Sequence, residues 1–414
     1  MKITTLQDLA PAGLDVAVDP YPVYAALREK GPVHRVLVPG SGEVWLIVAR
    51  DEARAALTDP RLRNDIRFSS SWTADGGHAI GLNMLQTDAP QHTRLRALVA
   101  REFTPGRIEA LRPRIEELAD RLVDGLLDTV VSTGSADLVG SFALTLPLTV
   151  ICELLGVPSA DHGTFHGWSS EIVAPTSAEA AEAAVAGMTG YFAALIEDKR
   201  ANPGDDLLSA LVAAATPAGA ATPAGGAPEP ASAPLSSEEL LGMAFLLLVA
   251  GHETTVNLIS GGVLALLTHP DQLAALRADP ALIDGAIEEM LRYDGPVGAA
   301  AFRFAAEPVE IGGTLVEAGD CVLVSLAAAS RDPRHFPDPD RFDIRRRSAG
   351  QLGFGHGIHH CLGAPLARAE AATAIRALFE RCPGLTLAAD PADLERRPSV
   401  LLRGVRSLPV RIAD

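Results

Sequence analysis

The chain has few of the features that mark several large classes of protein. Its four cysteines, Cys152, Cys321, Cys361 and Cys382, lie far apart in 414 residues, which excludes a dense disulfide framework and favours a reducing compartment. Aromatic residues make up 5%, too few for the stacking platforms of a single-strand nucleic-acid binder. Acidic residues outnumber basic ones by 52 to 35, and the net charge of −17 argues against a general nucleic-acid binder.

Long apolar runs are also absent. The longest, residues 240–251, is interrupted by His252 and Glu253 and is shorter than the roughly 20 apolar residues that a membrane-spanning helix needs. Residues 1–20 contain no apolar core of the length found in signal peptides. We therefore expect a soluble, cytoplasmic protein with no membrane or nucleic-acid partner.

The composition that remains, 48% hydrophobic and 21% charged, is that of a globular protein with a sizeable core. Hydrophobic periodicity predicts a long buried helix from Ser236 to Leu267, which begins with the capping box Ser236-Ser-Glu-Glu239. Other expected helices are Tyr21–Lys30, one covering Ile108–Leu127, Pro270–Ala278, Asp279–Tyr293 and Ala364–Glu380. Expected strands are Val33–Val38 and Val44–Ala49, which form a hairpin, and Val309–Ile311, Thr314–Val316 and Cys321–Ser325.

The order of these elements shows no alternation of strands and helices, so the expected fold class is mainly α with small β-sheets. We expect a single domain over residues 1–414. Within it, a Pro/Ala/Gly tract at 213–234 contains the repeat ATPAG and is typical of a flexible surface loop. A tolerated insertion without function is the simplest interpretation of this tract.

The middle of the long helix carries the unusual sequence Ala250-Gly-His-Glu-Thr-Thr255. A zinc-protease interpretation fails, because Val256 stands where the second histidine of H-E-x-x-H would be. Glycine and a buried acid both disfavour a regular helix here. Two interpretations stay open: a tolerated kink or helix end, or a local widening that lets Glu253 and Thr254 face a reactive centre and organise water and protons.

Two helical pairs are weaker signals. Glu289 and Arg292 are three residues apart, a spacing that favours an ion pair, although such pairs are also common on surfaces. His92 and Arg96 are four residues apart. One helix face therefore presents two cationic donors, suited either to a carboxylate or phosphate or simply to solvent.

The stretch FGHGIHHCLG, residues 354–363, holds three histidines and one cysteine. Zinc needs about four ligands, and no second Cys or His pair stands at a matching spacing. Leu362-Gly-Ala364 excludes a C-x-x-C redox motif, and His360 stands where a dinucleotide-binding loop has its third glycine. The composition favours a glycine-hinged loop that presents Cys361 before a helix. A thiolate is stabilised at such a position, and ligation of haem iron is one use of it.

Together these motifs resemble those of the cytochromes P450, over nearly the whole chain. The pattern F-x-x-G-x-x-x-C-x-G is matched by Phe354, Gly357, Cys361 and Gly363. A-G-x-E-T-T is matched at residues 250–255, and E-x-x-R at residues 289–292, in the order and spacing of the family. The resemblance implies a haem b monooxygenase that inserts one oxygen atom of O2 into a C–H bond, by hydroxylation or epoxidation, with electrons from NAD(P)H.

The resemblance also implies a role for each matched residue. Cys361 is expected to ligate the haem iron, with Phe354 packed on the sulfur side, and Glu253 and Thr254 are expected to deliver protons. The other expected cofactor contacts are Gly357, Gly363 and Ala250, and, at the haem propionates, His92, Arg96, Arg303 and His359. Glu289, Arg292 and Arg341 are expected to form a buried structural network, next to Asp340, where the family more often has Glu.

Segments such as RFDIRRRSAGQLGFGHGIHHCLGAPLARAE most resemble actinobacterial members that tailor macrolides and other polyketides. By family position the substrate pocket is expected within residues 65–85, 243–250, 297–302 and 399–402; the candidates are Met243, Leu247, Val297, Ala300 and Leu401. These small or apolar residues favour a bulky, largely apolar secondary metabolite. The early loop has Asp65 and Asp75 but no Glu, which argues against an amino-sugar anchor. Broad activity on steroids, terpenoids or xenobiotics is the alternative.

The sequence shows no flavin or nicotinamide fingerprint, so the resemblance implies a separate ferredoxin and ferredoxin reductase and an enzyme that is itself a monomer. The cations Arg345, Arg346, Arg347 and Arg368 are expected either to form a docking patch or to remain a solvated surface. A peroxide-driven peroxygenase and a non-enzymatic haem-binding protein are less favoured, because neither is expected to carry the proton-delivering pair Glu253 and Thr254.

Overall fold

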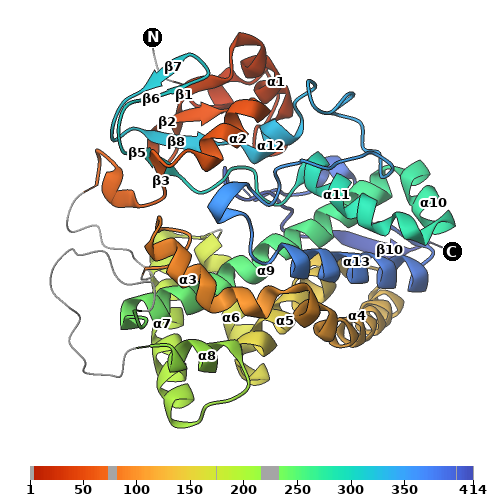
Figure 1. The fold of residues 1–414 in the computed structure, drawn as a ribbon. Coiled ribbons are helices and arrows are strands. Elements are labelled where there is room, and N and C mark those ends of the chain that lie inside the picture. Colours follow the sequence, from red (N-terminus) through yellow and green to blue (C-terminus); the bar gives the residue numbers. More distant parts are fainter. Residues whose placement is uncertain (1–3, 73–81, 174, 216–232, 398, 414) are drawn as a thin grey trace. The chain divides into compact units, whose positions relative to one another are not determined.

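The computed structural model describes residues 4–72, 82–173, 175–215, 233–397 and 399–413, so most of the expected loop at 213–234 lies outside the described residues. The chain divides into two compact units, whose helices and strands are labelled in Figure 1. The first comprises residues 1–72, 113–143 and 254–414, and the second comprises residues 73–112 and 144–253. Two long helices, α4 (Pro105–Thr133) and α9 (Ser237–Thr268), contribute residues to both units.

The first unit contains a five-stranded sheet with the strand order β1-β2-β8-β5-β3. β1 (Val33–Val38) and β2 (Gly42–Ile47) form the predicted antiparallel hairpin, whose turn places Gly40 and Gly42 at positive φ. β8 (Cys321–Val324) runs parallel to β2, and β5 (Arg303–Ala305) is antiparallel to both β8 and β3 (Leu62–Arg63). The sheet thereby places Arg303 on an inner strand.

Both faces of this sheet are buried. Because alternate strand residues point to opposite faces, Ile47 and Val322 lie in a hydrophobic cluster with residues of α2 (Arg50–Thr58), whereas Leu46 and Leu323 lie in a cluster with residues of α1 (Tyr21–Lys30). Each cluster also includes residues of α12 (Leu326–Ser330). Burial on both faces explains why β8 reads as an unbroken apolar run.

The rest of the first unit is mostly helical. α11 (Ile283–Asp294) packs against α12 and α13 (Ala364–Arg381), and α10 (Pro270–Ala278) precedes it. A small sheet has the strand order β4 (Ala136–Asp137), β10 (Pro409–Ile412), β9 (Leu385–Leu387), and β6 (Val309–Ile311) pairs with β7 (Thr314–Val316). The fold class is therefore mainly α with small β-sheets, as predicted.

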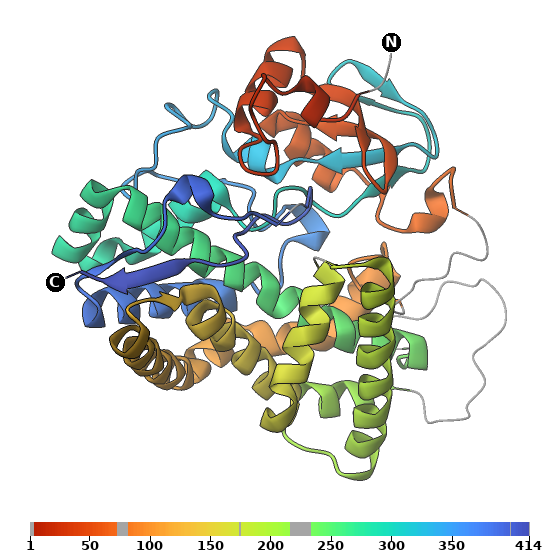
Figure 2. The same ribbon diagram turned by 180° about the vertical axis from the view of Figure 1, so that it is seen from behind.

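The second unit is helical, with α3 (Gln91–Ala100), α5 (Thr145–Leu155), α6 (His162–Val173), α7 (Ala178–Ala201) and α8 (Leu207–Ala213). α6 and α7 lie side by side (Figure 2). Between them Phe165, Trp168, Tyr191 and Phe192 form an aromatic cluster with mostly edge-to-face contacts. Gly187 permits this packing, because a Cβ there would lie 2.8 Å from the Trp168 ring.

The long helix α9 begins with the predicted capping box. Ser236 Oγ accepts a hydrogen bond from Glu239 N at 3.1 Å, and Glu239 Oε2 accepts one from Ser236 N at 3.0 Å. By length and composition α9 could cross a membrane, but 72% of its most apolar window is buried inside the protein, as expected of a core helix.

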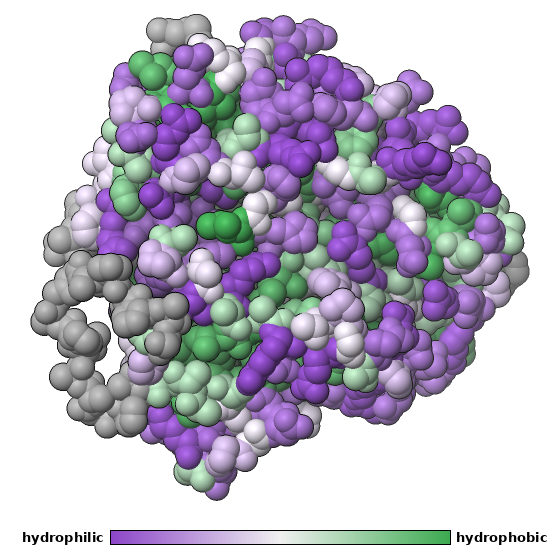
Figure 3. All heavy atoms as spheres, viewed as in Figure 1, coloured by the Kyte–Doolittle hydropathy of each residue, from purple (hydrophilic) through white to green (hydrophobic). Residues whose placement is uncertain are grey.

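The face shown in Figure 3 is mostly hydrophilic, with hydrophobic residues in small scattered groups.

Most predicted elements are present, and the differences lie at their ends. α1, α10, β1, β6 and β7 have the predicted bounds. The predicted helix Asp279–Tyr293 is instead a short 3-10 turn followed by α11, because the Asp279 side chain caps the turn by accepting from Ala281 N at 3.2 Å. The ends of the 213–234 tract meet where Leu235 N donates to the carbonyl oxygen of Ala214 at 3.0 Å.

Candidate active site

The loop before α13 presents Cys361 through turns that require glycine. Gly355 and Gly357 have φ values of 72° and 78°, in the left-handed region that side chains disfavour. A Cβ on Gly357 would also lie 2.8 Å from the carbonyl oxygen of Leu57, so only glycine allows the loop to approach α2 so closely. Cys361 N donates to the carbonyl oxygen of Phe354 at 2.9 Å, which closes the loop just before α13.

The donor atoms at this loop fit a cofactor that brings most of its own metal ligands. The described residues contain no group of three or more His, Cys, Asp or Glu suited to hold a metal ion. Burial raises the pKa of the Cys152 and Cys321 thiols to about 12, whereas Cys361 is exposed. A single sulfur ligand suits haem, since the porphyrin supplies the equatorial nitrogens, and it does not suit zinc, which needs several protein ligands.

Two of the four cations predicted at the haem propionates lie in the first unit. Arg303 is buried on β5, and its Nη1 donates to the carbonyl oxygen of Leu62 on β3 at 3.2 Å. His359 is half-buried in the 3-10 turn of the cysteine loop. His356 has a partner that the sequence did not predict, because Arg54 Nε of α2 lies 3.2 Å from its Nε2. Burial and the charge of Arg54 lower the pKa of His356.

The other two cations, His92 and Arg96, share one face of α3 in the second unit. His92 is 2% exposed, and burial together with the charge of Arg96 lowers its pKa. Arg94 lies on the opposite side of α3 and forms a buried ion pair with Glu239 of α9. Glu239 also accepts from Gln91 Nε2 at 2.7 Å. Sequence reasoning missed this pair, because no local spacing links α3 to α9.

The motif of residues 250–255 lies on an uninterrupted α-helix. The helix is continuous from Ser237 to Thr268, so the interpretation of residues 250–255 as a helix end is wrong. Gly251 has a packing role: a Cβ there would lie 2.8 Å from Ile151 Cγ1 of α5. Close helix packing, rather than a distorted backbone, accounts for the glycine.

Next to this glycine two polar side chains are buried. His252 Nδ1 donates to the carbonyl oxygen of Leu248 at 2.8 Å, and this bond turns Nε2 toward Glu253, whose Oε1 is 3.7 Å away. Glu253 is 1% exposed and Thr254 is half-buried. Glu253 is the last residue of the second unit, and Thr254 is the first residue of the segment 254–414 of the first unit. An acid and an alcohol are thus consecutive residues of α9.

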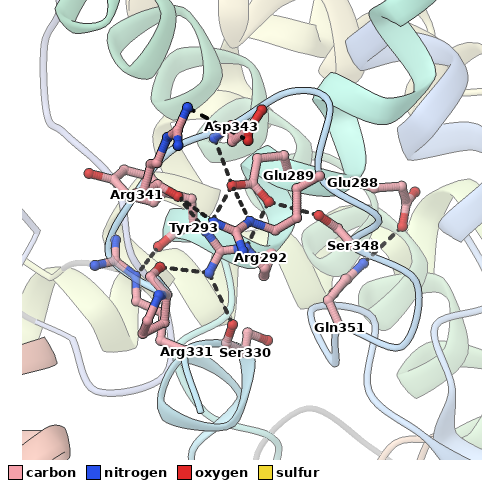
Figure 4. A network of polar contacts seen from close by, with 12 residues as sticks. Glu288, Glu289, Arg292, Tyr293, Ser330, Arg331, Arg341, Asp343, Ser348 and Gln351 are labelled. Carbon is pink, nitrogen blue, oxygen red and sulfur yellow. Dashed lines mark hydrogen bonds and ion pairs between the residues drawn. The ribbon is translucent and has the colours of Figure 1, made fainter. Parts of the chain in front are cut away.

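Glu289 and Arg292 form the ion pair that their spacing predicts (Figure 4). Their closest atoms are 2.7 Å apart, and both side chains are fully buried. Arg292 also donates to the carbonyl oxygens of Ser330, Pro339 and Arg341 at 3.3, 2.8 and 3.1 Å. A buried guanidinium is stable only when its donors are satisfied in this way.

The expected part of Arg341 in this network needs correction. Arg341 contributes its backbone carbonyl, while its guanidinium is exposed and 4.0 Å from Asp343. Two other side chains donate to the Glu289 carboxylate. Ser348 Oγ donates at 2.7 Å, as Figure 4 shows, and Arg346 Nε donates at 3.3 Å. Sequence reasoning missed both roles, because these residues lie 59 and 57 positions from Glu289.

The four arginines considered for a docking patch are not equivalent. Arg346 is held by Glu289 and by the carbonyl oxygens of residues 337, 338 and 341. Arg368 pairs with Glu288 at 2.5 Å and lies over the Phe354 ring at 4.5 Å, so it supports the cysteine loop. Arg345 and Arg347 are exposed.

The candidate pocket residues differ in burial. Met243 and Leu247 are buried on the first half of α9, and Val297, Ala300 and Leu401 are half-buried in the first unit. Asp65 is buried and binds Arg67, whose Nε lies 2.8 Å from Asp65 Oδ2. Residues 73–81 of the early loop, including Asp75, lie outside the described residues.

An exposed cysteine on a glycine-hinged loop, together with the acid and alcohol of α9, agrees with the resemblance to haem-thiolate proteins. The profile of the cytochrome P450 family matches residues 172–404. Cytochrome P450 monooxygenase PikC of Streptomyces venezuelae is 55% identical over 404 residues, which cover 98% of this chain and 94% of the relative.

Two further comparisons agree. The 6-deoxyerythronolide B hydroxylase of Saccharopolyspora erythraea is 44% identical over 423 residues, which cover 99% of this chain and 100% of the relative. The structure of the tirandamycin C-bound P450 monooxygenase TamI matches with a TM-score of 0.86 at 43% identity, over 97% of this chain and 99% of that chain. The chain belongs to the cytochrome P450 family. It is a haem-thiolate monooxygenase that receives electrons from NAD(P)H through redox partners.

Proposed function

We propose that the protein hydroxylates or epoxidises a bulky, largely apolar secondary metabolite of the macrolide or polyketide type. The name of one relative, 6-deoxyerythronolide B hydroxylase, supports this substrate class. Residues 297–301 of this chain are Val-Gly-Ala-Ala-Ala, whose small side chains leave room for a large substrate. Asp65 is bound by Arg67 and is therefore a poor anchor for an amino sugar.

The observation that carries the proposal is the single thiol held by the glycine loop before α13. We assign Cys361 as the residue that would ligate the haem iron, with Phe354, Gly357, Gly363 and Ala250 as cofactor contacts. The backbone amides and dipole of the first helical turn stabilise a thiolate at this position. When haem is bound it supplies the activation of O2, which side chains cannot provide.

The four cations are assigned to the haem propionates. Arg303 is a buried guanidinium on a rigid strand, a suitable group for holding a carboxylate. His92 is buried on α3, and its ring nitrogens are suitable partners for a carboxylate. Arg96 and His359 are half-buried and complete the set.

Glu253 and Thr254 are assigned to proton delivery. Glu253 is buried, and its Oε1 lies 3.7 Å from Nε2 of His252. The Thr254 hydroxyl can both donate and accept a hydrogen bond, so it can pass a proton through ordered water. Met243, Leu247, Val297, Ala300 and Leu401 are assigned to the substrate pocket.

The electron donor that we infer is a ferredoxin with its ferredoxin reductase, acting on a cytoplasmic monomer. Arg345 and Arg347 are the exposed cations that support a docking surface, whereas Arg346 and Arg368 are engaged in contacts within the first unit. Long-range steering by such cations speeds encounter with an acidic protein.

The haem assignment is tested by the difference spectrum that carbon monoxide produces with the reduced protein. We expect a red-shifted band for the wild type and its loss in Cys361→Ser, because the thiolate causes the shift. Cys321→Ser is the matched control and should keep the band. A red-shifted band in Cys361→Ser would overturn the assignment.

The substrate class is tested by screening compounds for a low- to high-spin shift. Macrolactones such as 6-deoxyerythronolide B are expected to produce the shift. A response confined to steroids or terpenoids would instead favour the broad-range alternative, and turnover supported better by peroxide than by ferredoxin would favour a peroxygenase.

A further inference from the structure

A polar cluster at the end of α11 joins three distant segments of the first unit. Asp294, the last residue of α11, accepts through Oδ1 from Tyr21 Oη at 2.8 Å and from Arg403 Nε at 2.7 Å. Its Oδ2 accepts from Arg396 Nη1 at 3.1 Å. Arg403 and Tyr21 are both buried, and Arg403 Nη2 also donates to the carbonyl oxygen of Val18 at 3.3 Å. None of these residues belongs to the P450 motifs of the sequence.

The electrostatics keep this cluster charged. Burial by itself would raise the pKa of Asp294, but Arg403 and Arg396 outweigh it and hold the pKa below its ordinary value. Burial would likewise lower the pKa of Arg403, and Asp294 and Tyr21 outweigh that effect and raise it. The ion pair therefore persists at any physiological pH, and removing one partner leaves the other without its counter-charge.

The backbone of Arg403 joins two segments that the proposed function places at the substrate. Arg403 N donates to the carbonyl oxygen of Pro296 at 2.9 Å, and Gly298 N donates to that of Leu401 at 2.8 Å. Val297 and Leu402 face each other in an antiparallel bridge. The approach is close, because a Cβ on Gly298 would lie 3.1 Å from the carbonyl oxygen of residue 400 and 3.3 Å from Arg403 Cγ.

The two joined segments are anchored differently on their outer sides. Residues 296–300 are bound to the large sheet, since Ala300 N donates to the carbonyl oxygen of Val324 of β8 at 2.9 Å. Residues 399–402 form the tip of a hairpin whose arms are joined by an Arg396–Val405 bridge. The tip is positioned by the packing of Val400 and Leu401 on the hydrophobic cluster that includes α1 residues, and by the hydrogen bond of Arg403 to Asp294.

We propose that the Asp294–Arg403 pair, supported by Tyr21, sets the register between residues 296–300 and 399–402 and thereby determines which carbon of the substrate is oxidised. The inference rests on the proposed function, which assigns Val297, Ala300 and Leu401 to the pocket. A misplacement of about 1 Å can change a reaction rate about 100-fold, so a pair remote from the reacting atoms can control selectivity. Asp294 and Arg403 are thus positioning residues.

The test uses Arg403→Met, which keeps much of the apolar stem and removes the charge. With 6-deoxyerythronolide B as the probe, we expect an altered ratio of oxidised products. With phenylimidazole, an azole that binds haem iron and fills the pocket, we expect a Kd raised about 10-fold, whereas the Kd of the smaller imidazole should change less than about 2-fold. A change confined to the larger azole is what a shifted pocket wall produces and a damaged haem site does not.

Two further variants make the result decisive. Arg396→Met is the matched control: it removes a charge from the same carboxylate but leaves the bond between Asp294 and Arg403, so both azole affinities should stay as in the wild type. Tyr21→Phe removes one hydrogen bond to Asp294 without disturbing the fold and should raise the Kd of phenylimidazole about 3-fold. If Arg403→Met misfolds and loses the red-shifted carbon monoxide band, the phenylimidazole Kd of Tyr21→Phe tests the proposal instead.

The outcomes separate this inference from the proposed function. A wild-type protein without the red-shifted band would overturn the haem assignment. A wild-type protein that shows no spin shift with 6-deoxyerythronolide B would overturn only the substrate class, and phenylimidazole would then remain as the probe. With the band intact, unchanged phenylimidazole affinity in both Arg403→Met and Tyr21→Phe would overturn the register proposal. An effect of Arg396→Met as large as that of Arg403→Met would also overturn it, because it would indicate a general charge effect.

Discussion

Glu370, on α13, is a buried acid with no ion pair among the residues that the structure describes. It is 1% exposed, and its Oε2 has no hydrogen-bond partner in the described part of the chain. Thr373, one turn further along α13, is also buried, and its Oγ1 likewise has no hydrogen-bond partner in the described part of the chain. Burial raises the pKa of the Glu370 carboxyl to about 8, so the group is protonated at neutral pH.

We predict that Glu370 makes the protein less stable as the pH rises. Its pKa is about 4.3 in an unfolded chain and about 8 in the folded protein, so between these values only the folded state holds the proton. The stabilisation is complete below the unfolded pKa and is lost as the pH approaches the folded one, by about 1.4 kcal/mol of unfolding free energy per pH unit.

Glu370→Gln lacks this titration and isolates it. Its stability advantage over the wild type should grow between about pH 5.5 and about pH 8, as measured by urea unfolding at each pH. The comparison with wild type at the same pH cancels the contributions of all other titrating groups. A difference that stays constant with pH would contradict the prediction.

The second residue to test is Thr254. Thr254→Ala preserves the helix, since alanine has the highest helix propensity, and removes the hydroxyl that we assign to proton delivery. We expect at least about a 10-fold fall in product formed per O2 consumed, because positioned acid–base groups contribute about 10²–10⁴-fold. Measured oxygen uptake, peroxide and product give this ratio. Thr268→Ala, at the end of the same helix, is the control, and undiminished coupling in Thr254→Ala would contradict the assignment.

At the scale of elements, one buried ion pair joins α3 to the start of α9 in the second unit. The Arg94 and Glu239 side chains are each 3% exposed, and Glu239 also closes the capping box of α9. The Glu239 carboxylate therefore both caps the start of α9 and binds Arg94 of α3. Because His92 and Arg96 lie on the opposite face of α3, the pair fixes the helix that presents them.

Breaking this pair should destabilise the protein strongly. Glu239→Gln leaves the Arg94 guanidinium without its carboxylate, and we expect a loss of about 3–5 kcal/mol in the free energy of unfolding. The double variant Arg94→Met with Glu239→Leu should recover much of that loss, since apolar side chains can replace a buried pair. Urea unfolding measures both. Glu238→Gln, at the exposed neighbouring position, is the control, and equal stability of Glu239→Gln and Glu238→Gln would contradict the prediction.

At the scale of the whole molecule, the net charge of −17 contrasts with the exposed arginines near the cysteine loop in sequence. We predict that reversing Arg345 and Arg347 to Glu slows reduction by ferredoxin at low salt by about 10-fold, because rim charges act mainly on the association rate. Reduction by dithionite should be unchanged. Stopped-flow reduction at two ionic strengths measures the effect. Arg411→Glu, an exposed arginine of β10, is the control, and an equal loss with it would argue against a docking role.

Much of the fold was predictable because it depends on short-range rules. The capping box at Ser236 and Glu239 and the hairpin of β1 and β2 are determined by residues only a few positions apart. The packing role of Gly251 was not predictable, because a Cβ there would lie 2.8 Å from Ile151 Cγ1, a contact with another helix that no local pattern encodes.

The sequence by itself determined which groups are available for chemistry: one thiol in a glycine-rich loop before a helix, an acid followed by an alcohol on a core helix, and the pair Glu289–Arg292 at helical spacing. Only the tertiary structure decided which residues from distant parts of the sequence bind the buried charged groups. Arg346 and Ser348, not the Arg341 side chain, satisfy Glu289, and Asp294 meets Arg403 across 109 positions of sequence. Local geometry constrains residues within a turn or two of each other, whereas a buried charge is satisfied by whichever donor the path of the chain brings to it.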